Sequence, residues 1–305
     1  MSEVLSWTLH VAVALVAAPL QLGIINKTKA WFAGRVGPPV LQPYYDLIKL
    51  ARKDSVFSTT TTWLFRVGPV VSLVTAIFAV LLVPLGTASA PVSFTGDLVL
   101  LAYLFALGRF FTVSAALDTG SAFEGMGAAR EVTFACFAEP AFFLGMLVLA
   151  KLSGSLQLVD MLGTSATSHW GVASASLVLV LLSWFIVLLA ENCRIPFDDP
   201  NTHLELTMIH EVMVLDHSGP ALGMILYGAA LKLFVFAALI VRLVLPFSTG
   251  IPALDWAVFL VGIAVVSLAV GVVESVMARL RLLHIPTLLV AACLLSAFGV
   301  ILTMR

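Results

Sequence analysis

The sequence has few charged residues and few cysteines. Only 11% of its 305 residues are Asp, Glu, Lys or Arg, whereas 61% are hydrophobic. A soluble domain carries about a quarter charged residues, so the composition excludes an ordinary soluble globular protein. The three cysteines, Cys136, Cys193 and Cys293, form no CxxC pair. Their spacing therefore indicates neither a structural zinc site nor an iron–sulfur cluster, and we expect reduced thiols.

The motifs of several enzyme classes are also missing. There is no Walker loop, no GxGxxG motif and no HExxH motif, because position 214, where HExxH would need its second histidine after His210, is Val214. Nucleotide binding and zinc-dependent hydrolysis are therefore excluded. We expect no catalytic residue, no metal ligand and no resident cofactor in this chain.

Long apolar runs dominate what is present. A run of about 20 residues crosses the hydrocarbon layer of a bilayer as a helix. Eight such runs occur, namely Val4–Ile25, Val67–Gly86, Leu98–Leu117, Val132–Ala150, Gly171–Ala190, Ala221–Leu245, Trp256–Val273 and Ile285–Met304. The sequence therefore predicts an all-α, polytopic membrane protein that forms one integral membrane domain over residues 1–305. We expect the first run to remain as a helix, because its Met-Ser-Glu flank is not the basic flank of a signal peptide.

The charged residues are concentrated on one side of the predicted bilayer. Eleven of the sixteen Lys and Arg residues, and twelve of the seventeen acids, fall in the segments 26–66, 118–131, 191–220 and 274–284. Lys and Arg accumulate in short cytoplasmic loops. We therefore predict that these four segments are cytoplasmic, that both termini lie outside, and that the ionic face carries the function.

The segment after the first span is amphipathic. After Pro43, the apolar residues and the charged residues each recur at helical spacing; they are Tyr44, Leu47, Ile48 and Ala51, and Asp46, Lys49, Arg52 and Lys53. This pattern predicts a helix that lies in the membrane interface. Two interpretations remain open, an anchor on the lipid surface and a platform for a soluble partner.

An acid lies inside the fourth predicted span. Glu139 is about two turns into Val132–Ala150 and directly precedes Pro140. An ionisable residue at this depth is costly unless it faces a wet cavity or a partner. Arg109 and Lys232 are the cations at comparable depth. Both a static ion pair that fixes helix packing and a step in a proton relay fit this position.

The stretch AENCRIPFDDPNTHLELTMIHE, residues 190–211, follows the fifth span and is rich in acids. Asp199-Pro200 is a typical helix start, which predicts a short polar helix from Pro200 to about Leu215. The histidines His203, His210 and His217 recur every seven residues. On a helix they would lie about 10 Å apart along the axis, so one metal ion cannot bind all three. The helix is either a solvated polar element or part of a carboxylate and imidazole cluster that passes protons.

Three segments, in this order, resemble a known family. GRVGPPVLQPYYDLIKL, GMGAAREVTFACFAEP and AENCRIPFDDPNTHLEL resemble the family that joins the membrane-anchor subunit of complex I with its relatives in formate hydrogenlyase and energy-converting [NiFe] hydrogenases. The resemblance covers essentially the whole chain. LDTGSAFEGMGAARE and HLELTMIHEVMVLDHSGP are similar to the hydrogenlyase branch, and Tyr45, Ala138, Asn201 and His203 depart from the complex I pattern.

The resemblance implies a non-catalytic subunit of an oxidoreductase complex in the cell inner membrane. Such a subunit docks a redox arm and links electron transfer to proton or sodium translocation. The implied partners are a [NiFe]-hydrogenase-like large subunit, a small Fe–S subunit, antiporter-like membrane subunits and the lipid bilayer, with the NiFe centre and Fe–S clusters in those partners and no nucleic acid. A quinone-binding subunit of a complex I-type oxidoreductase and an independent ion transporter remain the alternatives.

Depth in the membrane and the matched motifs together predict two groups of functional residues. The ion-coupling group is Glu131, Glu139, Glu191, Glu205, Glu211 and Lys232. The group expected to dock the redox arm is Gln42, Asp46, Lys49, Arg130, Arg194, Asp198, Asp199 and His203.

Overall fold

Eight long helices make up most of the computed structural model, which describes residues 3–86, 89–163, 167–199, 208–246 and 248–304. They are α1 (Glu3–Phe32), α3 (Trp63–Leu82), α4 (Asp97–Asp118), α5 (Ala122–Ser153), α7 (Thr167–Glu191), α9 (Gly219–Val244), α10 (Pro252–Val276) and α11 (Ile285–Thr303). All eight are long and apolar enough to span a membrane. No strand occurs in the described part of the chain. The predicted all-α, polytopic membrane fold is confirmed.

Four short elements complete the described chain. They are α2 (Gln42–Ala51), α6 (Leu158–Leu162), α8 (His210–Met213) and the 3-10 helix η2 (Leu282–His284). The predicted amphipathic helix is present as α2, with proline in its first turn and no buried residue. Tyr45 and Ile48 are at least half exposed, as expected of a helix that lies in the membrane interface.

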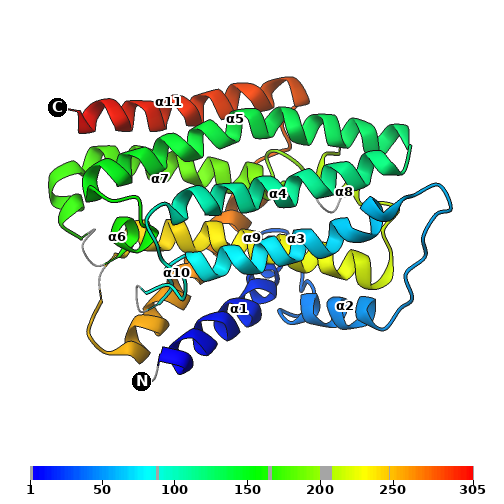
Figure 1. The fold of residues 1–305 in the computed structure, drawn as a ribbon, viewed down its shortest axis with the longest axis horizontal. Helices are drawn as coiled ribbons and strands as arrows, with labels where there is room; N and C mark the ends of the chain where they lie inside the picture. The colour runs from blue at the N-terminus through cyan, green and yellow to red at the C-terminus, as the bar shows by residue number, and fades with distance from the viewer. Residues whose placement is uncertain (1–2, 87–88, 164–166, 200–207, 247, 305) are drawn as a thin grey trace.

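Most of the long helices run roughly along the long axis of the molecule, whereas α1 and α10 are inclined to it (Figure 1). The chain termini lie at one end of the molecule, whereas α2 and α8 lie toward the other end. Helix α9 is the central element, because it contacts α1, α3, α7 and α10 and 72% of its apolar window is buried. The arrangement places both termini on the same side, as an even number of spans requires.

One predicted loop is largely helical. Residues 122–131, assigned above to the polar segment 118–131, form the first turns of α5. Hydropathy marks the apolar length of a span but not the end of its helix, and Ala, Met, Glu and Arg in this stretch favour helix. Gly127 serves packing rather than a turn, because a Cβ at this position would lie 2.8 Å from the carbonyl oxygen of Ile209. Likewise, α1 continues to Phe32, inside the segment 26–66.

The predicted polar helix is shorter in the described chain. Residues 200–207 lie outside the described part, α8 covers only four residues, and Met208 and Ile209 before it are not helical. The Asp198 carboxylate accepts hydrogen bonds from the backbone N–H groups of Ile209 and His210. A side chain thus replaces the helical carbonyl partner there. His217 follows α8 in a non-helical segment, so His210 and His217 do not share a helix face.

Candidate functional site

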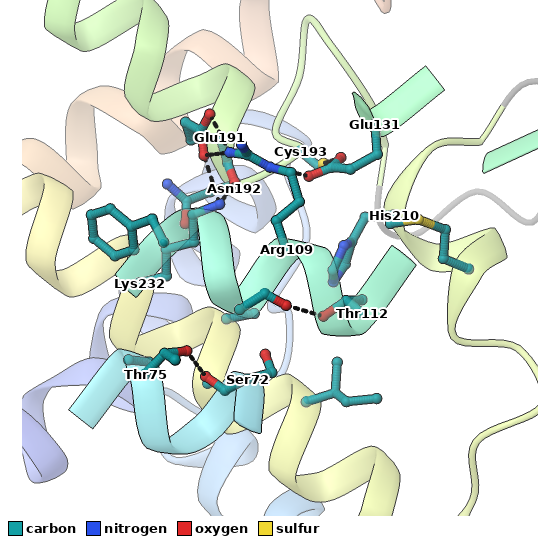
Figure 2. Close-up of a pocket in the computed structure, with 17 residues that line it drawn as sticks. Ser72, Thr75, Arg109, Thr112, Glu131, Glu191, Asn192, Cys193, His210 and Lys232 are labelled. Carbon is teal, nitrogen blue, oxygen red and sulfur yellow. Dashed lines mark hydrogen bonds and ion pairs between the residues drawn. The ribbon is translucent and has the colours of Figure 1, made fainter. Parts of the chain in front are cut away.

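Arg109 is the centre of a buried ionic cluster. Its side chain, on α4, is only 10% exposed. The guanidinium Nη2 lies 2.5 Å from Oε2 of Glu191 at the end of α7, and Nη1 donates a hydrogen bond to Glu139 on α5. The Nε atom is 3.5 Å from Oε1 of Glu131, also on α5. Arg109 therefore joins three carboxylates from two helices, and Figure 2 shows it between Glu131 and Glu191.

Lys232 supplies a second cation from the central helix α9. Its Nζ lies 2.7 Å from the Glu191 carboxylate and donates to the Glu191 backbone carbonyl at 2.8 Å. The last carbonyls of a helix lack helical partners and carry partial negative charge. Lys232 therefore neutralises the end of α7 as well as the Glu191 side chain.

Two cavities adjoin this cluster. A cavity of about 70 Å³ is lined by Arg109, Glu131, Glu191 and Lys232 among others, which is room for a few water molecules. A second cavity, of about 180 Å³, is walled by the aromatic residues Tyr103, Phe105, Phe142, Phe143 and Phe236 and reaches Arg109, Glu139 and Glu191. The Glu139 side chain is 43% exposed. Space beside an ionic group can admit the water molecules that exchange protons with it, whereas a group without adjoining space lacks this route.

A third cavity, of about 270 Å³, lies toward the polar end of the molecule. Its apolar walls come from α1, α2 and α9, through residues that include Leu22, Leu47 and Leu233. Its polar lining comes from α2, the segment after α7, and α8, and consists of Asp46, Asn192, Arg194, Asp198, His210 and Glu211, with Asn26 from α1. The cavity is thus amphiphilic, with an ionic side next to an aliphatic side.

A separate set of ion pairs fixes the segment after α7. The side chain of Glu274 on α10 has no exposed area; it pairs with Lys29 of α1 at 2.9 Å and with Arg194 at 3.3 Å. Asp198, whose side chain is 1% exposed, pairs with Arg279 at 2.9 Å. These ion pairs connect α1, α10 and the chain leading to α8.

The predicted docking residues divide into exposed and inward-facing ones. On α2, Asp46 and Lys49 are exposed, and Gln42 Nε2 donates to Asp46 Oδ1 at 2.9 Å. Arg194 and Asp198 face inward, into the pairs just described. A partner surface could therefore contact α2 directly, whereas Arg194 and Asp198 act through the segment that they hold.

The other docking residues lie at the base of the α8 segment. Arg130 Nη1 donates to the backbone carbonyl of Met208 at 2.8 Å, which ties α5 to this segment. Asp199 is half-buried, and its backbone N–H donates to the Asp198 side chain. His203 lies outside the described residues. The docking role of this group stays a prediction.

Four of the six predicted coupling residues come together at one place. Glu131, Glu139, Glu191 and Lys232 all belong to the Arg109 cluster. Glu211 instead lines the third cavity, and Glu205 lies outside the described residues. The coupling role of the group stays a prediction, although the proximity of the four fits it.

Arg109 is the residue that the predicted groups lacked. It is the only charged residue within the run Leu98–Leu117, and this isolation was the available signal. Cys193 and His210 also line the first cavity (Figure 2). The seven-residue histidine spacing marks His210, whereas no local pattern marks Cys193. Burial, followed by the nearby Glu131 carboxylate, raises the pKa of the Cys193 thiol, so the thiol is neutral at ordinary pH.

Fold and comparisons together define a polytopic membrane subunit. A family model described as NADH dehydrogenase matches residues 5–304, and the chain belongs to that family, which is complex I subunit 1-like. It is 34% identical over 277 residues to formate hydrogenlyase subunit 4 of Escherichia coli, covering 88% of this chain and 89% of that one. It is also 34% identical over 280 residues to hydrogenase-4 component C of the same organism, covering 90% and 87%.

More distant relatives connect the chain to complex I. It is 28% identical over 228 residues to an NADH-quinone oxidoreductase subunit of Rubrobacter xylanophilus, covering 74% of this chain and 68% of that one. A chain in the solved structure of the membrane-bound sulfane sulfur reductase, an archaeal respiratory membrane complex, matches with a TM-score of 0.84 at 22% identity, over 99% of this chain and 100% of that chain. That likeness supports the fold.

Proposed function

We propose that this chain is the membrane-anchor and coupling subunit of an energy-converting [NiFe] hydrogenase or formate hydrogenlyase complex. In this function it docks the redox arm and links electron transfer to proton or sodium translocation. The similarity to formate hydrogenlyase subunit 4 and hydrogenase-4 component C supports the type of complex. The NiFe centre and the Fe–S clusters then belong to partner subunits, and antiporter-like subunits share the membrane.

The observation that carries the proposal is the convergence of three carboxylates on Arg109 beside internal cavities. Burying a charged group in a membrane is costly unless it is paired. Here every charge has a partner, and Arg109 has more than one. If Glu139 takes up a proton, the guanidinium keeps its contacts with Glu131 and Glu191. A proton can therefore enter or leave the cluster without leaving Arg109 as an unpaired buried charge.

The same cluster is connected to the predicted docking face. Glu131 is on α5, one residue after Arg130, which holds the α8 segment through Met208. His210 of α8 lines the same cavity as Arg109. A change in charge or position of a partner that contacts this face would be transmitted to the cavity through α8. We predict that this face is cytoplasmic, because it carries most of the Lys and Arg residues.

The first experiment replaces Glu139 by Gln in the assembled complex. The variant loses a proton-exchanging group but keeps a side chain of the same shape. We expect hydrogen or formate chemistry to continue near the native rate while ion translocation per turnover falls sharply, as measured in sealed vesicles. Unchanged translocation at full turnover would contradict the role of Glu139.

The matched control is Glu124→Gln on the same helix. Glu124 is buried and accepts a hydrogen bond from the backbone N–H of Asp216, an interaction that a glutamine oxygen can keep. It lines none of the three cavities described above. Translocation should stay near native in this control.

A second candidate function is supported by the third cavity. Its aliphatic wall between α1, α2 and α9 and its polar end suit an amphiphile such as a quinone, and one relative is named as part of an NADH-quinone oxidoreductase. Solvent extraction of the purified complex followed by mass spectrometry tests this alternative. Stoichiometric quinone that is lost when Leu47 is replaced by Trp would favour it, whereas nickel without quinone would favour the hydrogenase type.

A further inference from the structure

Three side chains with metal-binding atoms meet at the rim of the first cavity. They are Glu131 of α5, Cys193 of the segment after α7, and His210 of α8, and one ligand atom from each lies within 4.8 Å of the other two. Positions 131, 193 and 210 are far apart in the sequence, so spacing could not reveal them. Figure 2 shows all three around the same space, with the Glu131 carboxylate next to the Cys193 sulfur.

The distances between the three ligand atoms are close to the distances between ligand atoms around a bound metal ion. In a tetrahedral zinc site, with bonds of about 2.0–2.3 Å, neighbouring ligand atoms lie roughly 3.5 Å apart. Cys193 Sγ is 3.6 Å from Oε2 of Glu131. The widest separation, 4.8 Å, requires only a shift of about 1 Å by this measure.

The contacts that Glu131 and His210 already make leave one atom of each side chain able to bind a metal ion. Glu131 uses Oε1 toward Arg109. Its Oε2 accepts a hydrogen bond from the Cys193 thiol, and a metal ion that displaces the thiol proton would take the place of that bond. His210 Nε2 is buried and has no hydrogen-bond partner among the described residues. An imidazole nitrogen without a partner beside a polar cavity is costly, and a metal ion would satisfy it.

The charge of the surroundings also favours a divalent ion. The cluster holds three carboxylates, on Glu131, Glu139 and Glu191, against two cations, on Arg109 and Lys232, which leaves one negative charge. A divalent cation that displaces the thiol proton of Cys193 adds one net positive charge and releases that proton to water. The occupied cluster would then be neutral, despite the proximity of Arg109.

From these observations we infer that Glu131, Cys193 and His210 form a binding site for a borderline-soft divalent cation of the Zn²⁺ type, with a water molecule from the cavity as a fourth ligand. Mixed sulfur, nitrogen and oxygen donors suit this class of ion. The ion would tie α8 and the segment after α7 to α5. On the basis of the proposed function, it would also occupy the Glu131 carboxylate and so inhibit ion translocation.

The test measures how fast each cysteine of the purified full-length chain reacts with a small thiol reagent, with and without Zn²⁺. Peptide mapping by mass spectrometry reports each cysteine separately. Zn²⁺ should slow the reaction of Cys193 by at least about tenfold, because a sulfur that is bound to the metal is no longer free to attack the reagent. Cys136, which is exposed on α5, is the internal control and should react equally fast in both conditions.

Two variants decide whether the effect belongs to this site. His210→Ala and Glu131→Gln each keep Cys193 but remove one ligand, and protection by Zn²⁺ should be lost in both. Equal reaction rates of Cys193 with and without Zn²⁺ in the native chain would overturn the inference, and so would undiminished protection in both variants. If Cys193 proves too slow to label, metal analysis of the native chain and of Cys193→Ser replaces it, and equal zinc contents would overturn the inference. Because neither readout involves ion translocation, failure of the metal site and failure of the coupling function are distinguishable.

Discussion

The two sets of buried ion pairs in this molecule differ in their access to space. The Arg109 cluster borders cavities of about 70 and 180 Å³, and its Glu139 side chain is 43% exposed. The carboxylate side chain of Glu274 is 0% exposed, and Glu274 lines none of the three cavities. The carboxylate side chain of Asp198 is 1% exposed, although Asp198 also lines the third cavity. Carboxylates that look alike in the sequence are therefore in two physical situations.

This difference separates structural from exchangeable charges. A sealed pair that loses one partner leaves an uncompensated buried charge, so it fixes the fold and is poorly suited to change its protonation. A cluster with alternative partners and nearby space can redistribute charge at lower cost. The comparison assigns ion coupling to the Arg109 cluster and the positioning of α8 to the pairs of Glu274 and Asp198.

The largest effect on stability is expected from Asp198→Ala. The substitution removes the partner of Arg279 and the acceptor for the backbone N–H of Ile209. Breaking a buried pair from one side costs about 3–5 kcal/mol, so we expect a large fall in the unfolding temperature in detergent and loss of assembly. Asp54→Ala, at an exposed aspartate after α2, is the control and should change little. If the Asp198→Ala variant were as stable as the native chain, the structural role assigned to the Asp198 ion pair would be wrong.

A smaller loss of stability, with loss of coupling, is expected from Arg109→Met. Three carboxylates lose their shared cation, but they can become neutral by taking up protons from the adjoining cavities. We expect an assembled complex that retains redox turnover and no longer translocates ions, measured in vesicles. Arg66→Met, at an exposed arginine on α3, is the control. If Arg109→Met unfolds the chain more than Asp198→Ala does, the distinction between the two regions fails.

A double-mutant cycle on Lys232 and Glu191 sharpens the comparison within the cluster. Lys232→Met and Glu191→Gln each break the 2.7 Å pair, so their effects on unfolding free energy should not add. We expect an interaction energy of about 0.5–3 kcal/mol, the range for residues in contact. The same cycle on Lys232 and Glu274, which share no contact in the described structure, should be additive. Additivity in both cycles would show that the Lys232–Glu191 contact carries no energy.

The last effect is a pH dependence that comes from outside both regions. Burial lowers the pKa of His217 to about 4, and the ring stacks on Phe65 with centroids 3.9 Å apart. In the unfolded chain the His217 imidazole binds a proton near pH 6.5, whereas in the folded chain it binds one only near pH 4. Above about pH 6.5 His217 is neutral in both states and does not affect stability. As the pH falls from about 6.5 to about 4, proton binding favours the unfolded chain, and stability decreases by at most about 1.4 kcal/mol per unit.

Unfolding temperatures measured between pH 7.5 and 5 test this dependence. His217→Phe keeps a ring on Phe65 but cannot titrate, so its pH dependence should be shallower than that of the native chain. His284→Gln, at an exposed histidine, should leave the native slope unchanged. Parallel slopes for the native chain and His217→Phe would contradict the assignment.

The sequence predicts the membrane fold well because hydropathy is a local property. Each of the eight apolar runs became a long helix, and the pattern after Pro43 became α2. The ends of helices were less predictable: Gly127 resembled a loop residue but permits close packing against Ile209, and the bonds of Asp198 shorten α8. Those outcomes depend on contacts between distant segments.

The candidate site was predictable only where depth in the membrane marked it. Glu139 was identified because it is an acid inside an apolar run, and the same reasoning applies to Arg109. The roles of Asp198, Glu274 and Cys193 depend on what lies next to them in three dimensions. No spacing in the sequence distinguishes the sealed carboxylate of Glu274 from the cavity-facing one of Glu131.

The most direct test of this account is the number of ions translocated per hydrogen molecule in vesicles that contain Glu139→Gln or Glu274→Gln complexes. The account predicts that Glu139→Gln assembles normally and loses translocation, whereas Glu274→Gln assembles poorly, and whatever complex does form keeps the native ratio. A native ratio in fully assembled Glu139→Gln, with a reduced ratio in Glu274→Gln, would contradict it.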